Sequence, residues 1–185
     1  LRELQAQLPE LCLLLSVDES ARFVDEIDVD IAIGNRPLLQ PGLQEIPLFQ
    51  DERVLVANTD LARKLAIVPQ TQHHLHADLT CLEESLTSDV TAPLFLGPLA
   101  RFRKRAIYDD ARLLIEAVLE GGCIACLPRL LVDASLARGQ LQILSEYPRL
   151  PGSTWWLSGM EKQARSEIVL QVFNWLRAQS TELHS

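Results

Sequence analysis

Two groups of residues in this chain have the types and spacing of a redox or metal site. Cys123 and Cys126 form a Cys-x-x-Cys pair inside an apolar run. The second group consists of His73, His74, His76 and Asp78. Residues i and i+3 of a strand point to opposite faces, so we interpret the cysteines as buried small hydrophobic residues. Three histidines without a fixed fourth ligand favour an exposed loop over a zinc, copper or nickel site. We expect no bound metal ion and no cofactor.

The chain contains none of the short motifs that mark common enzyme classes. It lacks a Gly-x-Ser-x-Gly elbow, a phosphate-binding loop and a His-Glu-x-x-His helix. Its formal net charge of −8 argues against a basic face for nucleic acid. The basic cluster at residues 101–105 is typical of a solvated loop or of a contact with acids on a partner. These features predict a binding protein that is not an enzyme.

Composition indicates size and cellular setting. The chain has 185 residues, of which 48% are hydrophobic, and this suits one domain or two small lobes sharing a chain. No apolar run approaches the roughly 18–20 residues that span a bilayer. No secretory signal opens the chain, and the four cysteines form no dense framework, which is typical of a reducing compartment. We expect a cytoplasmic protein without membrane contact.

The more informative chemistry lies where two apolar segments end in polar residues. The run from residue 29 to 33 is followed by Gly34, Asn35 and Arg36, which offer close backbone approach, an amide and a carboxylate-binding guanidinium. The run from 105 is followed by a second group, Tyr108, Asp109 and Asp110. Carboxylates at a helix start favour an ammonium or guanidinium ligand over an anion. The alternatives without a ligand are a polar surface turn for the first group and a helix cap for the second.

Apolar periodicity predicts the elements that position these residues, in an α/β protein with mostly parallel sheets. The predicted strands are residues 11–17, 29–33, 44–49, 54–57, 79–83, 105–110, 123–127, 141–144 and 153–158. The predicted helices are residues 1–8, 21–27, 59–66, 111–120, 129–140 and 163–179. Thr59 or Asp60 is expected to cap the helix at 59–66, and Gly121 to end the helix at 111–120. Residues 68–78 are expected to form a polar loop, and 85–104 give no clear pattern.

Several stretches together resemble a known family. They are LQAQLPELCLLLSVDE, VDIAIGNRP followed by PGLQEIPLFQDERVLVAN, DDARLLIEAVLEGGCIACLPRLLV, LARGQLQIL and the closing RSEIVLQVFNWLRAQ. In order and spacing they resemble the effector-binding domain of LysR-type transcriptional regulators, although each motif alone is weak. Residues 68–104 contribute almost nothing to the resemblance.

The resemblance implies a type 2 periplasmic-binding-protein-like fold, with two Rossmann-like α/β lobes joined by two crossing strands. Lobe one is expected at 1–55 and 158–185, and lobe two at 56–157. A small-molecule effector is expected in the cleft between the lobes, where ligands of open α/β sheets meet the carboxyl ends of strands. The implied effector contacts are Gly34, Asn35, Arg36, Tyr108, Asp109 and Asp110, and these charges suit an amino-bearing or zwitterionic effector.

The same resemblance implies a homodimer, or a tetramer at full length, that binds DNA through a helix-turn-helix domain upstream of this chain. The segments 11–17 and 123–127, with helices 1–8 and 111–120, are the expected dimer faces. The chain departs from the family because its pattern lacks the first strand of lobe one and the Ser/Thr loop after it, so we expect a longer natural protein. Two alternatives stay open, namely a periplasmic solute-binding protein of this fold and an enzyme on this scaffold.

Overall fold

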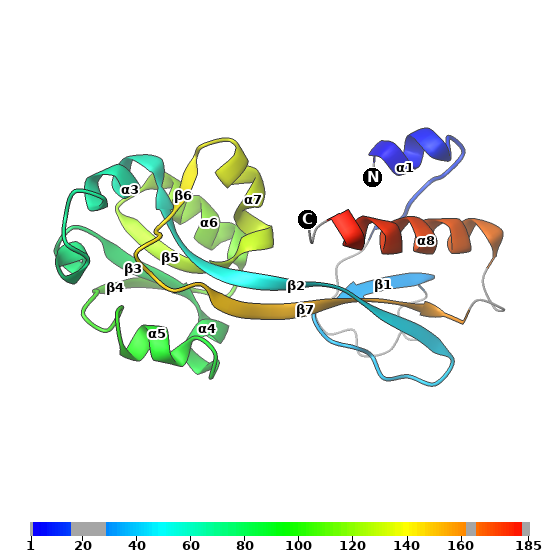
Figure 1. The fold of residues 1–185 in the computed structure, drawn as a ribbon, viewed down its shortest axis with the longest axis horizontal. Helices are drawn as coiled ribbons and strands as arrows, with labels where there is room; N and C mark the ends of the chain where they lie inside the picture. The colour runs from blue at the N-terminus through cyan, green and yellow to red at the C-terminus, as the bar shows by residue number, and fades with distance from the viewer. Residues whose placement is uncertain (1, 16–28, 162–165, 183–185) are drawn as a thin grey trace. The chain divides into compact units, whose positions relative to one another are not determined.

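The computed structural model divides the chain into two compact units, and describes residues 2–15, 29–161 and 166–182. Unit 1 comprises Leu1–Gln50 and Ser153–Ser185, and unit 2 comprises Asp51–Gly152. The chain passes between them in two long strands, β2 (Leu43–Asn58) and β7 (Leu150–Met160), which are neighbours in the sheet (Figure 1). The change of unit therefore falls inside each strand, a few residues before the positions that we expected.

Unit 1 is built on the strand order β1–β7–β2. β1 (Ile31–Gly34) pairs antiparallel with β7, and the helix α8 (Glu167–Glu182) contributes the buried Phe173 and Val172. Phe173 packs with Leu48 and Leu157 in the core of this unit. The predicted strand at 29–33 and the predicted C-terminal helix are confirmed, with shifted ends. A short helix, α1 (Arg2–Gln7), confirms the helical pattern at the start.

The strand predicted at 11–17 is wrong where the structure describes it. Residues 11–15 have no regular secondary structure, and Leu14 is 95% exposed. A continuous apolar run indicates a strand covered on both faces only if neighbouring strands satisfy its backbone. No described strand pairs with residues 11–15. The helix predicted at 21–27 lies outside the described residues.

Unit 2 has the strand order β2–β5–β3–β4, and β6 (Leu141–Ile143) also pairs with β2. β3 (Asp78–Leu82) is parallel to β4 (Lys104–Tyr108) and to β5 (Cys123–Pro128). β2 is antiparallel to β5 and β6. The sheet is thus mixed, and the expectation of a mostly parallel sheet is corrected. β2 begins in unit 1 and continues directly into unit 2, so no βαβ crossover sets its direction relative to β5.

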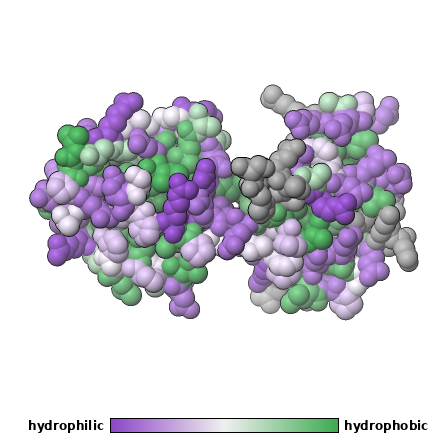
Figure 2. Space-filling model, in the orientation of Figure 1, coloured by the Kyte–Doolittle hydropathy of each residue, from purple (hydrophilic) through white to green (hydrophobic). Residues whose placement is uncertain are grey.

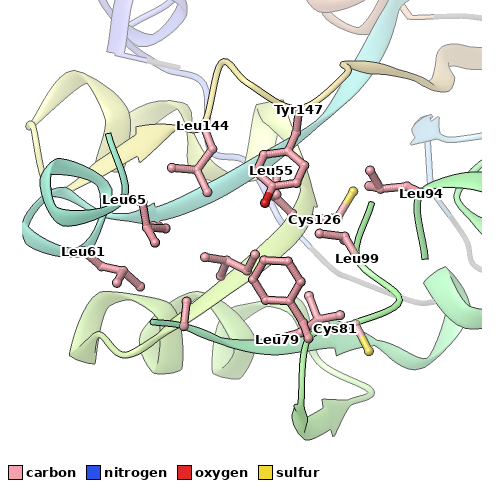
Figure 3. Packing of buried hydrophobic residues seen from close by; sticks show 14 of the residues in the cluster. Leu55, Leu61, Leu65, Leu79, Cys81, Leu94, Leu99, Cys126, Leu144 and Tyr147 are labelled. Carbon is pink, nitrogen blue, oxygen red and sulfur yellow. The ribbon is translucent and has the colours of Figure 1, made fainter. Parts of the chain in front are cut away.

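Helices cover both faces of this sheet. Alternate residues of β2 and β5 point to opposite faces, as a pleated strand requires. One face packs against α6 (Ala111–Glu120) and α7 (Arg129–Ala137) through Leu114, Val118 and Val132. The other packs against α3 (Thr59–Leu65) and α5 (Ala92–Leu96), with Leu55 and Leu79 among its strand residues (Figure 3).

Several local predictions for unit 2 are corrected. The two extended segments expected between 44 and 57 are one strand, β2, and the cap of α3 is Asn58, whose Oδ1 accepts from the Leu61 N–H at 2.9 Å. Residues 68–78 contain a 3₁₀ helix, η1 (Gln70–Leu75), rather than an exposed loop. The unclear stretch contains two short helices, α4 (Glu83–Thr87) and α5. Gly121 ends α6 as predicted, with a left-handed φ of 96°.

Surface character fits the composition. Figure 2 shows hydrophilic and hydrophobic residues interspersed over the visible face of each unit. Among the described residues, no helix has both the length and the apolarity needed to cross a bilayer.

Candidate functional site

The first predicted group lies at the carboxyl end of β1 in unit 1. Gly34 is the last residue of β1 and stands opposite Trp156 of β7, and Asn35 and Arg36 follow as exposed residues. In the described part of the chain, neither side chain has a hydrogen bond or an ion pair. A Cβ at Gly34 would meet only the Arg36 carbonyl oxygen, at an ordinary 3.6 Å. The guanidinium and the amide are therefore available to a ligand, and no protein neighbour requires glycine.

An aromatic pair lies beside this group. The β1–β7 register places Trp155 one position beyond the pair Gly34–Trp156, next to Asn35. Its ring stacks on Phe49 with a centroid separation of 6.3 Å. The indole Nε1–H is buried and has no hydrogen-bond partner among the residues that the structure describes. Such a buried donor usually finds a partner in water, protein or ligand.

The second predicted group lies at the carboxyl end of β4 in unit 2. Tyr108 ends the strand and packs partly against the α6 face of the core. Asp110 caps α6, since its carboxylate accepts from the Arg112 N–H at 2.7 Å and pairs with that guanidinium at 2.6 Å. The Arg112 side chain and backbone lower the pKa of Asp110 to about 2. The cap interpretation is thus confirmed for Asp110. Asp109 stays exposed, as a carboxylate with no hydrogen bond in the described part.

A third charged group at this edge, which the sequence did not predict, is an ion pair between β2 and α4. Arg53 of β2 stands opposite Pro128, the last residue of β5. Its side chain is only 13% exposed, and its guanidinium bonds Glu84 at 3.0 Å and the Ser85 hydroxyl at 3.4 Å. Both partners belong to α4, directly after β3. Two features of the sequence could have indicated this pair. Arg53 directly precedes the apolar run at 54–57, and Glu84 and Ser85 directly follow a predicted strand.

The start of α7 is tied to β2 at the same edge of the sheet. Asp51 accepts from the Leu130 N–H at 3.3 Å, which supplies the cap that Pro128 cannot. Glu52 pairs with Arg129 at 2.6 Å and with Arg149 at 3.0 Å. The hydrogen bond from Arg129 is the largest of several effects that lower the pKa of Glu52. These arginines are thereby neutralised, and the exposed Asp109 leaves this edge suited to a ligand cation.

Of the three clustered histidines, His73 is a structural residue of the core, whereas His76 is exposed. His73 has no exposed surface, and its Nδ1 lies 3.2 Å from the Tyr147 hydroxyl. Its Nε2 lies 3.1 Å from the Leu65 carbonyl and 3.0 Å from that of Val68. A hydrogen on Nε2 is shared by the two carbonyls, and Nδ1 then accepts from the Tyr147 hydroxyl. Within the residues described, no group of three metal-ligating side chains comes together.

The two cysteines of the Cys-x-x-Cys pair face opposite layers, as predicted. Cys123 packs in the cluster under α6 and α7, and Cys126 in the cluster under α3 and α5. Burial raises the pKa of the Cys126 thiol to about 11, which disfavours the reactive thiolate. In the basic cluster, Arg103 makes a two-pronged ion pair with Asp78 at 2.7 and 2.9 Å.

Comparisons with known proteins give one consistent result. A family model described as the LysR substrate binding domain matches residues 1–181. The effector domain of the regulator AmpR from Pseudomonas aeruginosa is similar, with TM-score 0.71 and 18% identity, and the match covers 97% of this chain and 86% of AmpR's. The regulatory domain of CrgA from Neisseria meningitidis has TM-score 0.69 and 21% identity, covering 96% and 88%. A search of curated protein sequences returned no match.

Proposed function

The chain belongs to the LysR substrate-binding domain family, and we propose on that basis that it senses a small-molecule effector for a transcriptional regulator. The observation that carries this proposal is the family match over residues 1–181. Homologous domains are effector-sensing regulatory domains of transcription regulators, with the two-lobe fold of periplasmic binding proteins. The two compact units and the two strands that connect them agree with that fold.

We assign effector contacts to the polar residues at the strand ends of each unit. In unit 1 these are Asn35 and Arg36, which follow β1 and carry unpaired donors. In unit 2 they are Tyr108 and Asp109, at the end of β4. Asp110 contributes by fixing the start of α6 beside Asp109. The guanidinium of Arg36 suits the carboxylate of an effector, and the carboxylate of Asp109 suits an amino group.

The proposed response is a shift of population between two arrangements of the regulator. An effector that binds one arrangement more tightly favours it by the difference in binding free energy. We propose that the natural protein is a cytoplasmic homodimer that carries a DNA-binding domain upstream of this chain. The effector then changes the dimer geometry and with it the contact with DNA.

A thermal-shift screen tests the proposal. The panel contains amino acids, polyamines, small carboxylates and aromatic acids. A ligand at a hundred times its dissociation constant adds about 2.7 kcal/mol to the free energy of unfolding. For a chain of this size that raises the melting midpoint by several degrees.

Variants locate the site. We expect the shift to disappear in Arg36→Ala and in Asp109→Ala. It should survive in Arg101→Ala and Asp89→Ala, which remove exposed charges of the same kind elsewhere. A hit that persists in both site variants would move the effector away from these strand ends. A panel without any hit would contradict effector sensing of these compound classes.

A further inference from the structure

The segment after Arg36 contains a strained backbone position. Leu39 has a φ of 57°, in the left-handed region that is unfavourable for residues with a Cβ. Its side chain is 80% exposed, so burial of the leucine does not offset this cost. A bulky apolar residue in such a conformation persists only when surrounding groups hold it there. A group outside residue 39 must therefore hold this turn.

The carboxylate of Glu45 holds it. One oxygen accepts from the Leu38 N–H at 2.6 Å, and the other accepts from the Leu39 N–H at 2.9 Å. The hydroxyl of Ser158, buried in β7, donates to the first oxygen at 2.9 Å. Two successive N–H groups that converge on a carboxylate form a backbone nest. Glu45 thus connects the turn to both β2 and β7.

The ionised form of Glu45 suits this arrangement. Partial burial acts to raise the pKa of Glu45, but hydrogen bonds from Leu38, Ser158 and Leu39 outweigh it and lower the pKa below the usual glutamate value. The group is a carboxylate at neutral pH. Hydrogen bonds to a charged acceptor are stronger than neutral ones, so this contact is able to maintain a strained turn.

Asn35 and Arg36 lie between two fixed points of the backbone. On one side, Gly34 is held by its pairing with Trp156. On the other side, Leu38 is held by Glu45, and Pro37 between them restricts φ. We propose that Glu45 is a positioning residue, which fixes the backbone of residues 35–39 so that Arg36 receives the carboxylate of the effector. This inference rests on the proposed function, because Arg36 has a carboxylate to receive only if the domain binds an effector there.

Hydrogen exchange tests the positioning role without any ligand. Backbone amide exchange is measured by NMR in the wild-type chain and in Glu45→Gln, with Glu161→Gln as the control. Glu161 is an exposed glutamate of unit 1. The glutamine keeps one carbonyl acceptor but turns an NH₂ group toward the second amide, so Leu39 should lose more protection than Leu38. We expect at least about tenfold faster exchange at Leu39, as for loss of one charge-assisted bond.

Rescue separates positioning from general damage. Asparagine tolerates the left-handed region, so Leu39→Asn added to Glu45→Gln should restore much of the lost order at residues 35–39. Unchanged exchange at Leu38 and Leu39 in Glu45→Gln would overturn the inference. Equal loss of protection across the whole of unit 1 would overturn it too, because Glu45 would then be a general stabilising residue.

Sodium acetate serves as the probe for the carboxylate contact. We expect saturable shifts of the Arg36 amide in the wild-type chain and in Glu161→Gln. Affinity should be at least about fivefold weaker in Glu45→Gln, as for loss of preorganisation, and absent in Arg36→Ala. If wild-type Arg36 does not respond while Leu39 exchange changes as expected, the turn is held by Glu45 but the proposed effector contact is refuted. The two failures are therefore distinguishable.

Discussion

Replacing His73 by phenylalanine should destabilise unit 2 strongly, although this residue lies in a histidine-rich segment that resembles a metal site. The substitution keeps an aromatic ring in a fully buried position but removes both ring nitrogens. The Tyr147 hydroxyl and the Val68 carbonyl then lose their ring contacts at 3.2 and 3.0 Å. The Leu65 carbonyl still accepts from the Val68 N–H at 2.9 Å, so it is not orphaned.

The magnitude follows from these two unpaired groups. The buried Tyr147 hydroxyl left without a partner costs roughly 1–3 kcal/mol, and the part-buried Val68 carbonyl costs about 1 kcal/mol, so we expect a loss of about 2–4 kcal/mol in the free energy of unfolding. Tyr147→Phe should cost less, about 1 kcal/mol, because it leaves only the Nδ1 of His73 unpaired. The double variant should show a coupling of about 1 kcal/mol, since the two side chains share one hydrogen bond.

Urea unfolding followed by circular dichroism measures these differences. His76→Phe is the matched control, because His76 is exposed, and it should change the free energy of unfolding by less than about 0.5 kcal/mol. Chelator or zinc should leave the wild-type midpoint unchanged. A loss below about 0.5 kcal/mol in His73→Phe, or a zinc-dependent midpoint that this variant abolishes, would refute the structural role.

Three further predictions concern other parts of the molecule. An NMR titration should give Asp110 a pKa of about 2, and Arg112→Ala should raise this pKa toward the ordinary aspartate value. Because folding lowers the pKa, the contribution of Asp110 to stability is present above the ordinary aspartate pKa and is lost as the pH falls toward 2. A thiol reagent at pH 8 should modify the exposed Cys12 quickly and the buried Cys126 only on unfolding, and rapid reaction of both would contradict the described burial. Gly152→Ala should lower the unfolding midpoint measured by circular dichroism, because the added Cβ would lie 2.7 Å from the Asp51 backbone. The expected cost in the free energy of unfolding is roughly 1–3 kcal/mol. An unchanged midpoint would mean that β2 and β7 are not so close at this position.

Local signals predicted most elements of unit 2 correctly. The helix at 111–120 had apolar periodicity, an aspartate at its start and a glycine at its end, and the structure has Ala111–Glu120 with these caps. The run at 123–127 lies fully buried in β5, with its cysteines on opposite faces. Period and capping are properties of neighbouring residues, so a sequence expresses them directly.

Features that depend on distant residues were not predictable in the same way. The apolar run at 11–17 has a strand-like pattern, yet pairing depends on which strands lie beside it. Arg53 finds its partners in α4 because the sheet order brings β2 near the end of β3. Likewise, Glu45 stabilises the turn at Leu39 through a contact that neither periodicity nor a cap motif indicates. The site residues predicted from the sequence lie at or just after the ends of β1 and β4, which is a local signal, and the effector contacts proposed for Asn35, Arg36, Tyr108 and Asp109 stay a prediction.

Isothermal titration of the strongest compound from the thermal-shift screen tests effector sensing most directly. The account predicts one binding site per chain in the wild-type protein and in Arg101→Ala. It predicts that Arg36→Ala and Asp109→Ala each weaken binding at least about tenfold, since each removes a charge-assisted contact. Unchanged affinity in both site variants, or no heat of binding with any compound of the panel, would contradict the claim that this domain senses a small-molecule effector through these residues.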